Sequence, residues 1–172
     1  MKIAYTMAPG RGDVDQLLQG VAASLIAKGL RPTGTAQVNI QRRIAGPCDM
    51  DVIVLPAGPT IRISQDLGAA ARGCRLDPDA LETAVGLVQS RLVQSDCLIV
   101  NKFGKHEAEG RGFRSAIGDA LELDLPVLVG LNPLNAGAFE EFTGGAAQRL
   151  APTRASLRDW ITGNLRTVSS VA

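Results

Sequence analysis

DCLIVNKFGKHEAEGRGFR, residues 96–114, passes within one residue from an apolar run to dense polar chemistry. Residues 97–100 have the composition of a strand that is buried on both faces of a sheet. Such a change marks the carboxyl end of a parallel strand, where loops and helix N-termini converge and ligands bind in open α/β sheets. The stretch therefore predicts a parallel α/β sheet with a ligand site at the end of this strand.

The polar part of the stretch is rich in groups that can carry positive charge. Five of its side chains can be cationic, and its three glycines let the backbone turn and approach a ligand closely. An anion is the natural ligand of such a loop. A solvated loop whose charges neutralise one another is the alternative, because charge clusters usually lie on the surface. The candidate ligand residues here are Asn101, Lys102, Lys105, Arg111 and Arg114.

The first 30 residues follow the order strand, glycine loop, helix. Residues 2–7 are apolar enough for a strand, APGRGDVD (8–15) is punctuated by Gly and Pro, and residues 14–30 have apolar positions at helical spacing. This is the order of a P-loop, in which backbone N–H groups and a helix N-terminus hold phosphate. The full GxxxxGK(S/T) pattern is absent, because Asp13 stands in the lysine position and Val14 in the hydroxyl position.

The lysine that pairs with the terminal phosphates and the hydroxyl that ligates magnesium are thus both missing from the glycine loop. What remains is a cradle of backbone amides with an arginine beside it. A plain tight turn is the alternative, since Gly and Pro are the usual turn residues. The candidate ligand residues of this loop are Pro9, Gly10, Arg11, Gly12 and Asp13.

The rest of the chain alternates strands with helices, which predicts a three-layer parallel α/β sheet. Asp77 before Pro78 is a strong helix start. Residues 51–55 and 60–65 indicate a small antiparallel hairpin appended to the sheet. We expect strands at 2–7, 33–38, 97–100, 126–131 and 148–150, helices at 14–30, 80–93, 112–123, 136–142 and 156–165, and a frayed tail at 167–172.

The three cysteines form no close CxxC pair, so they predict neither a disulfide framework nor a zinc site. Cys97 lies in the buried strand and is expected to be a small core residue. Cys48 and Cys74 lie in turns and can face a ligand. Arg75, beside Cys74, is a further candidate ligand residue, with a turn that only caps the sheet as an equal alternative.

The composition is that of a globular protein and excludes several classes of function. With 172 residues, 45% hydrophobic and 20% charged, the chain fits a single domain, 1–172. The net charge of +1 gives no electrostatic footprint for nucleic acid. No apolar stretch approaches the roughly 20 residues that cross a bilayer, and the first residues resemble a strand rather than a signal peptide. We therefore expect no membrane insertion and a cytoplasmic location.

Several motifs together resemble an uncharacterised bacterial family of divergent P-loop proteins. They are the degenerate glycine loop, SQDLG (64–68), GCRLDPDALE (73–82) and VNKFGKHEAEGRGFR (100–114). Members of this family often carry labels such as molybdenum transporter ATP-binding protein or nucleoside-triphosphatase-like protein. The resemblance covers nearly the whole chain and implies a sheet of P-loop nucleoside-triphosphatase type, together with a link to molybdenum metabolism.

The resemblance also implies altered chemistry at the end of the strand 97–100. In small P-loop nucleoside-triphosphatases the matching strand ends in acidic residues that position magnesium and water. Asn101 occupies that position here, and Glu107 is the one nearby acid that could take over. Both halves of the hydrolytic apparatus are therefore changed.

Three functions remain open from the sequence. The first is an anion-binding protein that holds an oxyanion, such as molybdate or tungstate, or a nucleotide that it does not hydrolyse. The second is a nucleoside-triphosphatase using ATP or GTP with Mg²⁺, in which Lys102 or Arg111 replaces the missing lysine and Glu107 orients water. The third is a regulatory or assembly protein, with a homo-oligomer left open.

We also expect the glycine loop and the loop after residue 100 to form one pocket, because the strands before them should be neighbours. His106, the only histidine, is interpreted as an exposed polar member of its loop rather than as a general base or a metal ligand. No metal site is predicted.

Overall fold

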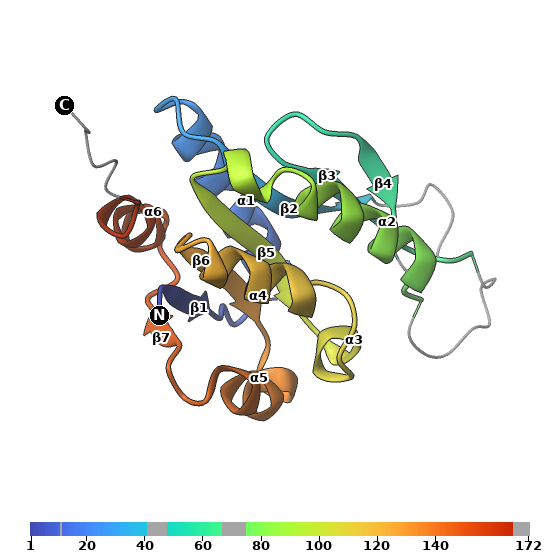
Figure 1. Cartoon of the computed structure of the whole chain (residues 1–172). Coiled ribbons are helices and arrows are strands. Elements are labelled where there is room, and N and C mark those ends of the chain that lie inside the picture. Colours follow the sequence, from blue (N-terminus) through green and yellow to red (C-terminus); the bar gives the residue numbers. More distant parts are fainter. Residues whose placement is uncertain (11, 41–47, 67–74, 167–172) are drawn as a thin grey trace.

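The computed structural model describes residues 1–10, 12–40, 48–66 and 75–166. Within these residues a seven-stranded sheet has the order β4-β3-β2-β5-β6-β1-β7 (Figure 1). The five strands from β2 to β7 along this order are parallel, and β3 and β4 run antiparallel beside β2. The strands are β1 (Ile3–Thr6), β2 (Pro32–Ile40), β3 (Asp49–Val54), β4 (Thr60–Arg62), β5 (Cys97–Phe103), β6 (Val127–Leu131) and β7 (Gln148–Leu150).

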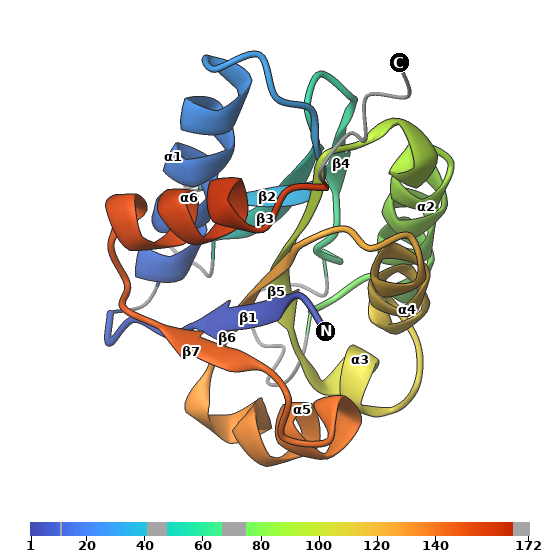
Figure 2. The ribbon, with the colours of Figure 1, turned by 60° about the vertical axis from the view of Figure 1, so that its left-hand side comes forward.

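Helices cover both faces of the sheet and give three layers. Helices α1 and α6 lie on one face, and α2 and α4 lie on the other (Figure 2). The short helices α3 and α5 lie near the carboxyl ends of β5 and β6, on the α2–α4 side. The bounds are α1 (Asp13–Ile26), α2 (Pro78–Gln89), α3 (Lys105–Ala108), α4 (Arg114–Glu122), α5 (Ala136–Thr143) and α6 (Arg154–Gly163), with 3₁₀ turns η1 (Leu92–Gln94) and η2 (Pro133–Asn135).

The strand β5 lies in the middle of the sheet and is buried on both faces, as its apolar run predicts. Leu98 and Val100 pack with α2 and α4, whereas Cys97 and Ile99 pack with α1 and α6. This alternation follows from the period of two in a strand. It also sends the side chains at the carboxyl end of β5 to opposite faces of the sheet.

The predicted fold class is confirmed, with differences at the ends of several elements. Asp77 caps α2 as expected, because its Oδ1 accepts the N–H of Ala80 at 3.1 Å. The expected hairpin forms, and β3 joins it to the sheet by pairing with β2 from Thr35–Val54 to Ile40–Asp49. The helix expected from residue 80 to 93 ends earlier, and η1 follows it.

The loop after β5 is more ordered than the sequence suggested. A one-turn helix, α3, forms at residues 105–108, where only a loop was expected, and α4 begins at Arg114 rather than at Gly112. Gly112 has a φ of 58°, a left-handed conformation that favours glycine. This turn separates the two helices. The expected frayed tail lies outside the residues that the structure describes.

Candidate functional site

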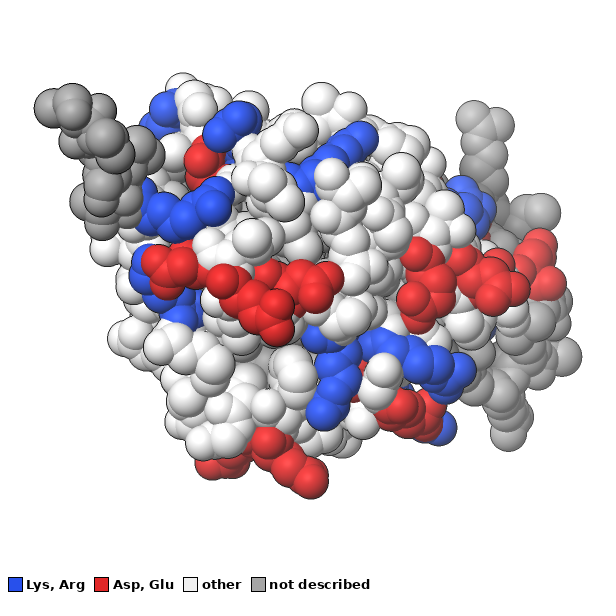
Figure 3. Space-filling view, viewed as in Figure 1, with Lys and Arg blue, Asp and Glu red and all other residues white. Residues whose placement is uncertain are grey.

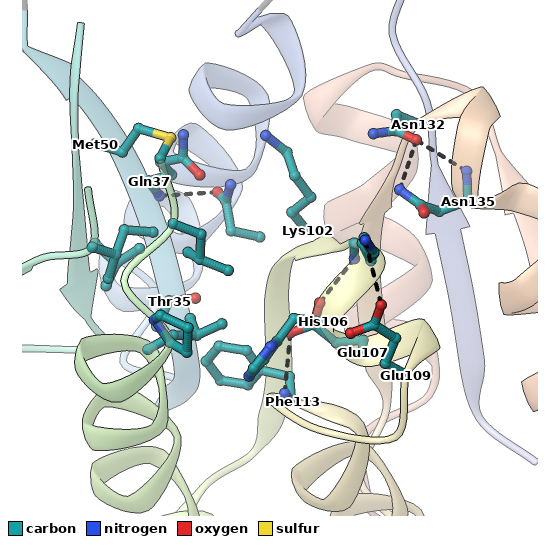
Figure 4. Close-up of a pocket in the computed structure, with 18 residues that line it drawn as sticks. Thr35, Gln37, Met50, Lys102, His106, Glu107, Glu109, Phe113, Asn132 and Asn135 are labelled. Atoms are coloured by element: carbon teal, nitrogen blue, oxygen red, sulfur yellow. Dashed lines mark hydrogen bonds and ion pairs between the residues drawn. The ribbon is translucent and has the colours of Figure 1, made fainter. Parts of the chain in front are cut away.

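A cavity of about 460 Å³ opens at the carboxyl ends of β2 and β5, on the α2–α4 face of the sheet (Figure 4). This is the edge at which ligands bind in α/β sheets. Its size falls in the range of small-molecule sites, roughly 300–1,000 Å³. Its apolar wall comes from β3, the segment after β4, α2 and the turn before α4, and consists of Met50, Val52, Ile63, Leu76, Leu81 and Phe113.

Lys102 is an exposed cation that lines this cavity. It lies in β5 where the register is irregular, between Val100 and Phe103, so the simple alternation of a strand does not set its direction. Figure 4 shows the side chain extending into the cavity, with Gln37 and Met50 on one side and Asn132 on the other. No residue in the described part of the chain forms an ion pair or hydrogen bond with its ammonium group.

Lys105 and Arg111 share one carboxylate on the surface near α3. Lys105 Nζ lies 3.6 Å from Glu109 Oε1, and Arg111 donates to Glu109 Oε2 at 2.7 Å. The hydrogen bond from Arg111 holds the pKa of Glu109 below its usual range. Positive and negative side chains lie side by side around α3 in Figure 3. Lys105 lines the cavity, whereas Arg111 lines a separate polar hollow with Glu82 and Ser115.

The structure places Arg75 and Arg114 away from the cavity wall. Arg114 lies over the ring of Phe142, with its guanidinium carbon 4.3 Å from the ring centroid. Arg75 donates to the backbone carbonyls of Gln65 and Cys48, each at 3.2 Å, and pairs with Asp49 at 3.4 Å. Both arginines therefore connect parts of the fold. Arg11 and Cys74 lie outside the described residues.

Glu107, the candidate for orienting water, is buried and bonded to the backbone on both sides. Its Oε2 accepts the N–H of Gly104 at 2.9 Å, and its Oε1 accepts the N–H of Phe113 at 3.2 Å. The first bond closes the start of α3, and the second ties the turn before α4 to it. The carboxylate thus holds the shape of the loop that forms one wall of the cavity.

The expectation of an exposed His106 is wrong, since only 7% of the residue is accessible to solvent. Its Nε2 lies 2.8 Å from Glu82 Oε1, and the N–H of Gly112 donates to the same oxygen at 2.8 Å. Burial raises the pKa of Glu82, but the bonds from Gly112 and His106 and the charges of His106 and Arg111 outweigh it and lower that pKa. The pair joins α2 to the loop after β5, which sequence spacing could not reveal.

In the glycine loop, a carboxylate of the protein itself binds a backbone amide. Gly12 has a left-handed φ of 86° as the N-cap of α1, and Asp13 Oδ2 accepts the N–H of Gly10 at 3.0 Å. This amide would face phosphate in a P-loop. Asp13 and Asp15 both lie in the first turn of α1, where the helix dipole favours negative charge. None of Pro9, Gly10, Gly12 and Asp13 lines the cavity described above.

Asp15 and Asn101 join the glycine-loop helix to β5. Asn101 Nδ2 donates to Asp15 Oδ1 at 2.8 Å, and Asn39 Nδ2 donates to Asp15 Oδ2 at 2.9 Å. Asn101 Oδ1 accepts the N–H of Gln37 at 3.0 Å. The approach of α1 depends on Gly130 of β6, because a Cβ there would lie 2.1 Å from the Asn101 carbonyl oxygen and 2.7 Å from Val14 Cγ1.

Asp15 was not among the predicted site residues, although its position in the sequence carries a signal. Asp15 precedes Leu18, Val21 and Leu25 at helical spacing, so an acid occupies the apolar face of α1. An acid at such a position needs a buried partner. Asn101, at the carboxyl end of another strand, provides part of it.

The expectation that β1 and β5 are neighbours is wrong, because β6 lies between them. Since the three strands are parallel, the glycine loop and the loop after β5 still lie at the same edge of the sheet. The bond between Asp15 and Asn101 links the two regions. The cavity, however, is lined by the second loop and not by the described residues of the first.

Metal and membrane features are absent from the part of the chain that the structure describes. Among these residues no three His, Cys, Asp or Glu side chains are grouped to hold a metal ion. No helix there is both long and apolar enough to cross a bilayer.

The layers and strand order define an α/β fold of P-loop nucleoside-triphosphatase type. A solved human protein, a cancer-related nucleoside triphosphatase, has a similar fold, with a TM-score of 0.59, 20% sequence identity and 87% of each chain covered. At this identity the likeness concerns the fold alone.

Residues 3–160 match the family described as "Protein of unknown function (DUF2478)", and the chain belongs to it. A similar relative is "Molybdenum import ATP-binding protein ModC 2" of Bradyrhizobium diazoefficiens, which is 34% identical over 160 residues. That alignment covers 92% of this chain but only 18% of the relative's length. The resemblance to divergent P-loop proteins labelled as molybdenum-related is thus confirmed.

Proposed function

We propose that this protein binds a small anion at the end of β5 and does not hydrolyse nucleotides. The observation that carries this proposal is the Lys102 ammonium group, which points into the cavity and has no partner among the described residues. A hydrogen bond between a charged group and its partner contributes roughly 1.5–3 kcal/mol net. An anion in the cavity would gain such bonds from Lys102, with Lys105 at the rim adding favourable charge.

The mouth of the cavity offers amides that can complete the coordination of an anion. Asn132 Oδ1 accepts two hydrogen bonds from Asn135, one from its backbone N–H at 3.1 Å and one from Asn135 Nδ2 at 3.0 Å. The Nδ2 group of Asn132 therefore remains as a donor beside Lys102, and both asparagines line the cavity. Lys102 lies near the carboxyl end of β5, and Asn132 follows directly after the neighbouring strand β6, so the sheet brings the two residues to the same edge.

Hydrolysis is not expected, because the groups that normally support it have other roles in this fold. Asp13 places a carboxylate on the Gly10 amide, where a phosphate would need a donor. Asn101 occupies the position of the magnesium-positioning acid and binds Asp15 directly. Phosphoryl transfer relies on correctly placed metal and positive charge, and in the glycine loop Asp13 and Val14 stand where the usual lysine and hydroxyl residue would be.

Two kinds of small anion fit this proposal. Molybdate or tungstate is suggested by the name of the relative from Bradyrhizobium, and a nucleotide is suggested by the P-loop type of fold. A nucleoside-triphosphatase that uses Lys102 and Glu107 is the second candidate function, and the likeness of fold favours it. Against it, both oxygens of Glu107 accept backbone N–H groups.

A regulatory role is the third candidate. In the relative named as a molybdenum import ATP-binding protein, the part similar to this chain makes up 18% of a much longer protein. An anion sensor that acts on an ATP-binding partner would fit that arrangement. Binding of the anion would then be the signal.

The test is a calorimetric and thermal-shift titration at fixed ionic strength with molybdate, tungstate, sulfate, phosphate, ATP and GTP, beside a Mg²⁺-dependent phosphate-release assay. We expect binding of at least one anion, weakened by Lys102→Ala but not by Lys28→Ala, which removes an exposed lysine from the turn after the C-terminal end of α1. Phosphate release at about 1–100 per second, the usual kinase range, would favour the hydrolytic candidate if Glu107→Gln abolished it. If no anion bound, the proposal would be rejected in favour of a partner surface.

A further inference from the structure

The cavity around Lys102 is built for more than a bare oxyanion. Six apolar side chains form one wall, and polar side chains line the rest of the cavity. Several of these polar groups, such as Asn101 and Glu107, are already hydrogen-bonded within the protein. Sites for organic ligands combine an apolar surface with a few polar atoms that are free to bind. A tetrahedral oxyanion has no apolar surface, so it would leave this wall in contact with water.

The polar group on β2 is held in one orientation by a chain of hydrogen bonds that begins on α1. The Asp15 carboxylate accepts a hydrogen bond from Asn39 Nδ2 at 2.9 Å, so Asn39 Oδ1 points the other way, toward Gln37. Gln37 Nε2 donates to that oxygen at 2.8 Å. The Oε1 atom of Gln37 is then left as an acceptor without a partner among the described residues.

Gln37 lies at the cavity, across from Lys102 (Figure 4). The cavity therefore presents a fixed acceptor on β2 and a cation on β5. Thr35, two residues earlier on the same face of β2, lines the cavity as well, and no hydrogen bond joins its hydroxyl to another described residue. A ligand that satisfies these groups needs an N–H donor at one end and a negative charge at the other.

We infer, as an extension of the proposed function, that the anion bound at Lys102 is a substituent of a planar nitrogen heterocycle. The flat ring packs against the apolar wall, where Met50 and Phe113 offer a polarizable sulfur and an aromatic ring. A ring or amino N–H donates to Gln37 Oε1, and the phosphate or carboxylate substituent binds Lys102. Purine mononucleotides and pterin carboxylates belong to this chemical class.

The inference excludes inorganic oxyanions as the preferred ligands on physical grounds. At neutral pH molybdate and sulfate present oxygen acceptors on every side, whereas phosphate keeps an O–H donor but has no surface that could cover the apolar wall. An oxygen of molybdate or sulfate would face the acceptor Gln37 Oε1, which lowers affinity rather than raising it. The heterocycle instead matches both polar ends and covers the apolar wall.

The experiment is a calorimetric titration of the purified full chain with GMP, ribose 5-phosphate, inorganic phosphate and molybdate, with pterin-6-carboxylate as a fluorescent probe. GMP and ribose 5-phosphate differ by the ring, so their comparison isolates its contribution. We expect GMP to bind at least about tenfold more tightly than ribose 5-phosphate, phosphate and molybdate. Lys102→Ala should weaken the binding of both GMP and pterin-6-carboxylate.

Two variants test the ring contacts, and a third is their control. Gln37→Met removes the acceptor at similar size, and Met50→Gln makes the apolar wall polar. Each should reduce the preference for GMP over ribose 5-phosphate and leave ribose 5-phosphate binding unchanged. Val93→Gln makes a comparable apolar-to-polar change at an exposed residue, 72% accessible, outside the cavity, and should alter neither.

The outcomes separate this inference from the function on which it rests. Equal affinity for GMP and ribose 5-phosphate, or oxyanions that bind as tightly as GMP, would overturn the inference that a ring is recognised. The proposed anion site would still stand if Lys102→Ala weakened binding. If neither Gln37→Met nor Lys102→Ala changed the affinity for GMP, the ligand would bind elsewhere and the inference would be overturned. No binding of any probe would overturn both.

Discussion

Asn101 at the carboxyl end of β5 donates through Nδ2 to Asp15 Oδ1 on α1, at 2.8 Å, and both residues are buried. The bond connects two residues that are 86 positions apart in the chain. An amide suits this position because it can donate to Asp15 while accepting from the Gln37 backbone.

Asn101→Asp should therefore destabilise the protein, since it places two buried carboxylates together and removes the donor between them. We expect the free energy of unfolding at neutral pH to fall by about 3 kcal/mol, measured by urea denaturation. Gln19→Glu makes the same chemical change at an exposed site on α1 and should alter stability by less than about 0.5 kcal/mol. Equal stability of Asn101→Asp and the wild type would show that the pair is not coupled.

Glu107 is expected to act on stability rather than on chemistry. Glu107→Ala leaves the backbone N–H groups of Gly104 and Phe113 without their acceptor, which should lower the free energy of unfolding by about 2–4 kcal/mol. Glu107→Gln keeps one acceptor oxygen and should cost less. Glu109→Ala, at a carboxylate that forms surface ion pairs, should cost at most about 1 kcal/mol. An unchanged free energy of unfolding in Glu107→Ala would contradict this role.

The Glu82–His106 pair predicts a weakening of the fold in acid. The folded-state pKa of Glu82 is lowered from 4.5, so its contribution is present above that value and is lost as the pH falls through the lower, folded pKa. The effect should be small because the Glu82 side chain is 47% exposed. Urea denaturation across this acid range should show a shallower pH dependence for Glu82→Gln than for the wild type. An identical slope in both proteins would speak against the pair.

Cys97 should be chemically inert in the folded protein. Burial first, and the nearby charge of Asp96 second, raise the pKa of its thiol to about 12, so almost no thiolate forms at neutral pH. In a Cys48→Ser/Cys74→Ser variant, a thiol reagent at neutral pH should label Cys97 only after urea is added. Rapid labelling under native conditions would indicate that β5 opens locally.

The elements that could be predicted from the sequence are those whose cause is local. The run at 97–100 and the Asp77–Pro78 helix start each depend on neighbours along the chain, and the structure has both. His106 was misjudged because its partner, Glu82, lies on another helix. The Asp15–Asn101 bond was missed for the same reason. Which cations face the cavity depends on how α3 and α4 divide the loop after β5. This division depends on Glu107, which binds the loop's own backbone, and on Glu82 of α2, which binds His106 and the N–H of Gly112.

The four cations of the loop after Val100 should contribute unequally to anion binding. Lys102→Ala should weaken anion binding about tenfold to a hundredfold, because a charge-assisted bond contributes roughly 1.5–3 kcal/mol. Lys105→Ala should have a smaller effect, about threefold or less, since the side chain is 84% exposed and already pairs with Glu109.

Arg111→Ala should change anion affinity by less than about twofold, because Arg111 does not line the cavity and its charge is paired with Glu109. Arg114→Ala should leave affinity unchanged and lower the free energy of unfolding by about 1 kcal/mol through loss of its contact with Phe142. Isothermal titration of the four variants with one anion gives the order directly. If Arg111→Ala weakened binding more than Lys102→Ala did, the anion would lie at the turn between α3 and α4, and the cavity beside β5 would not be its site.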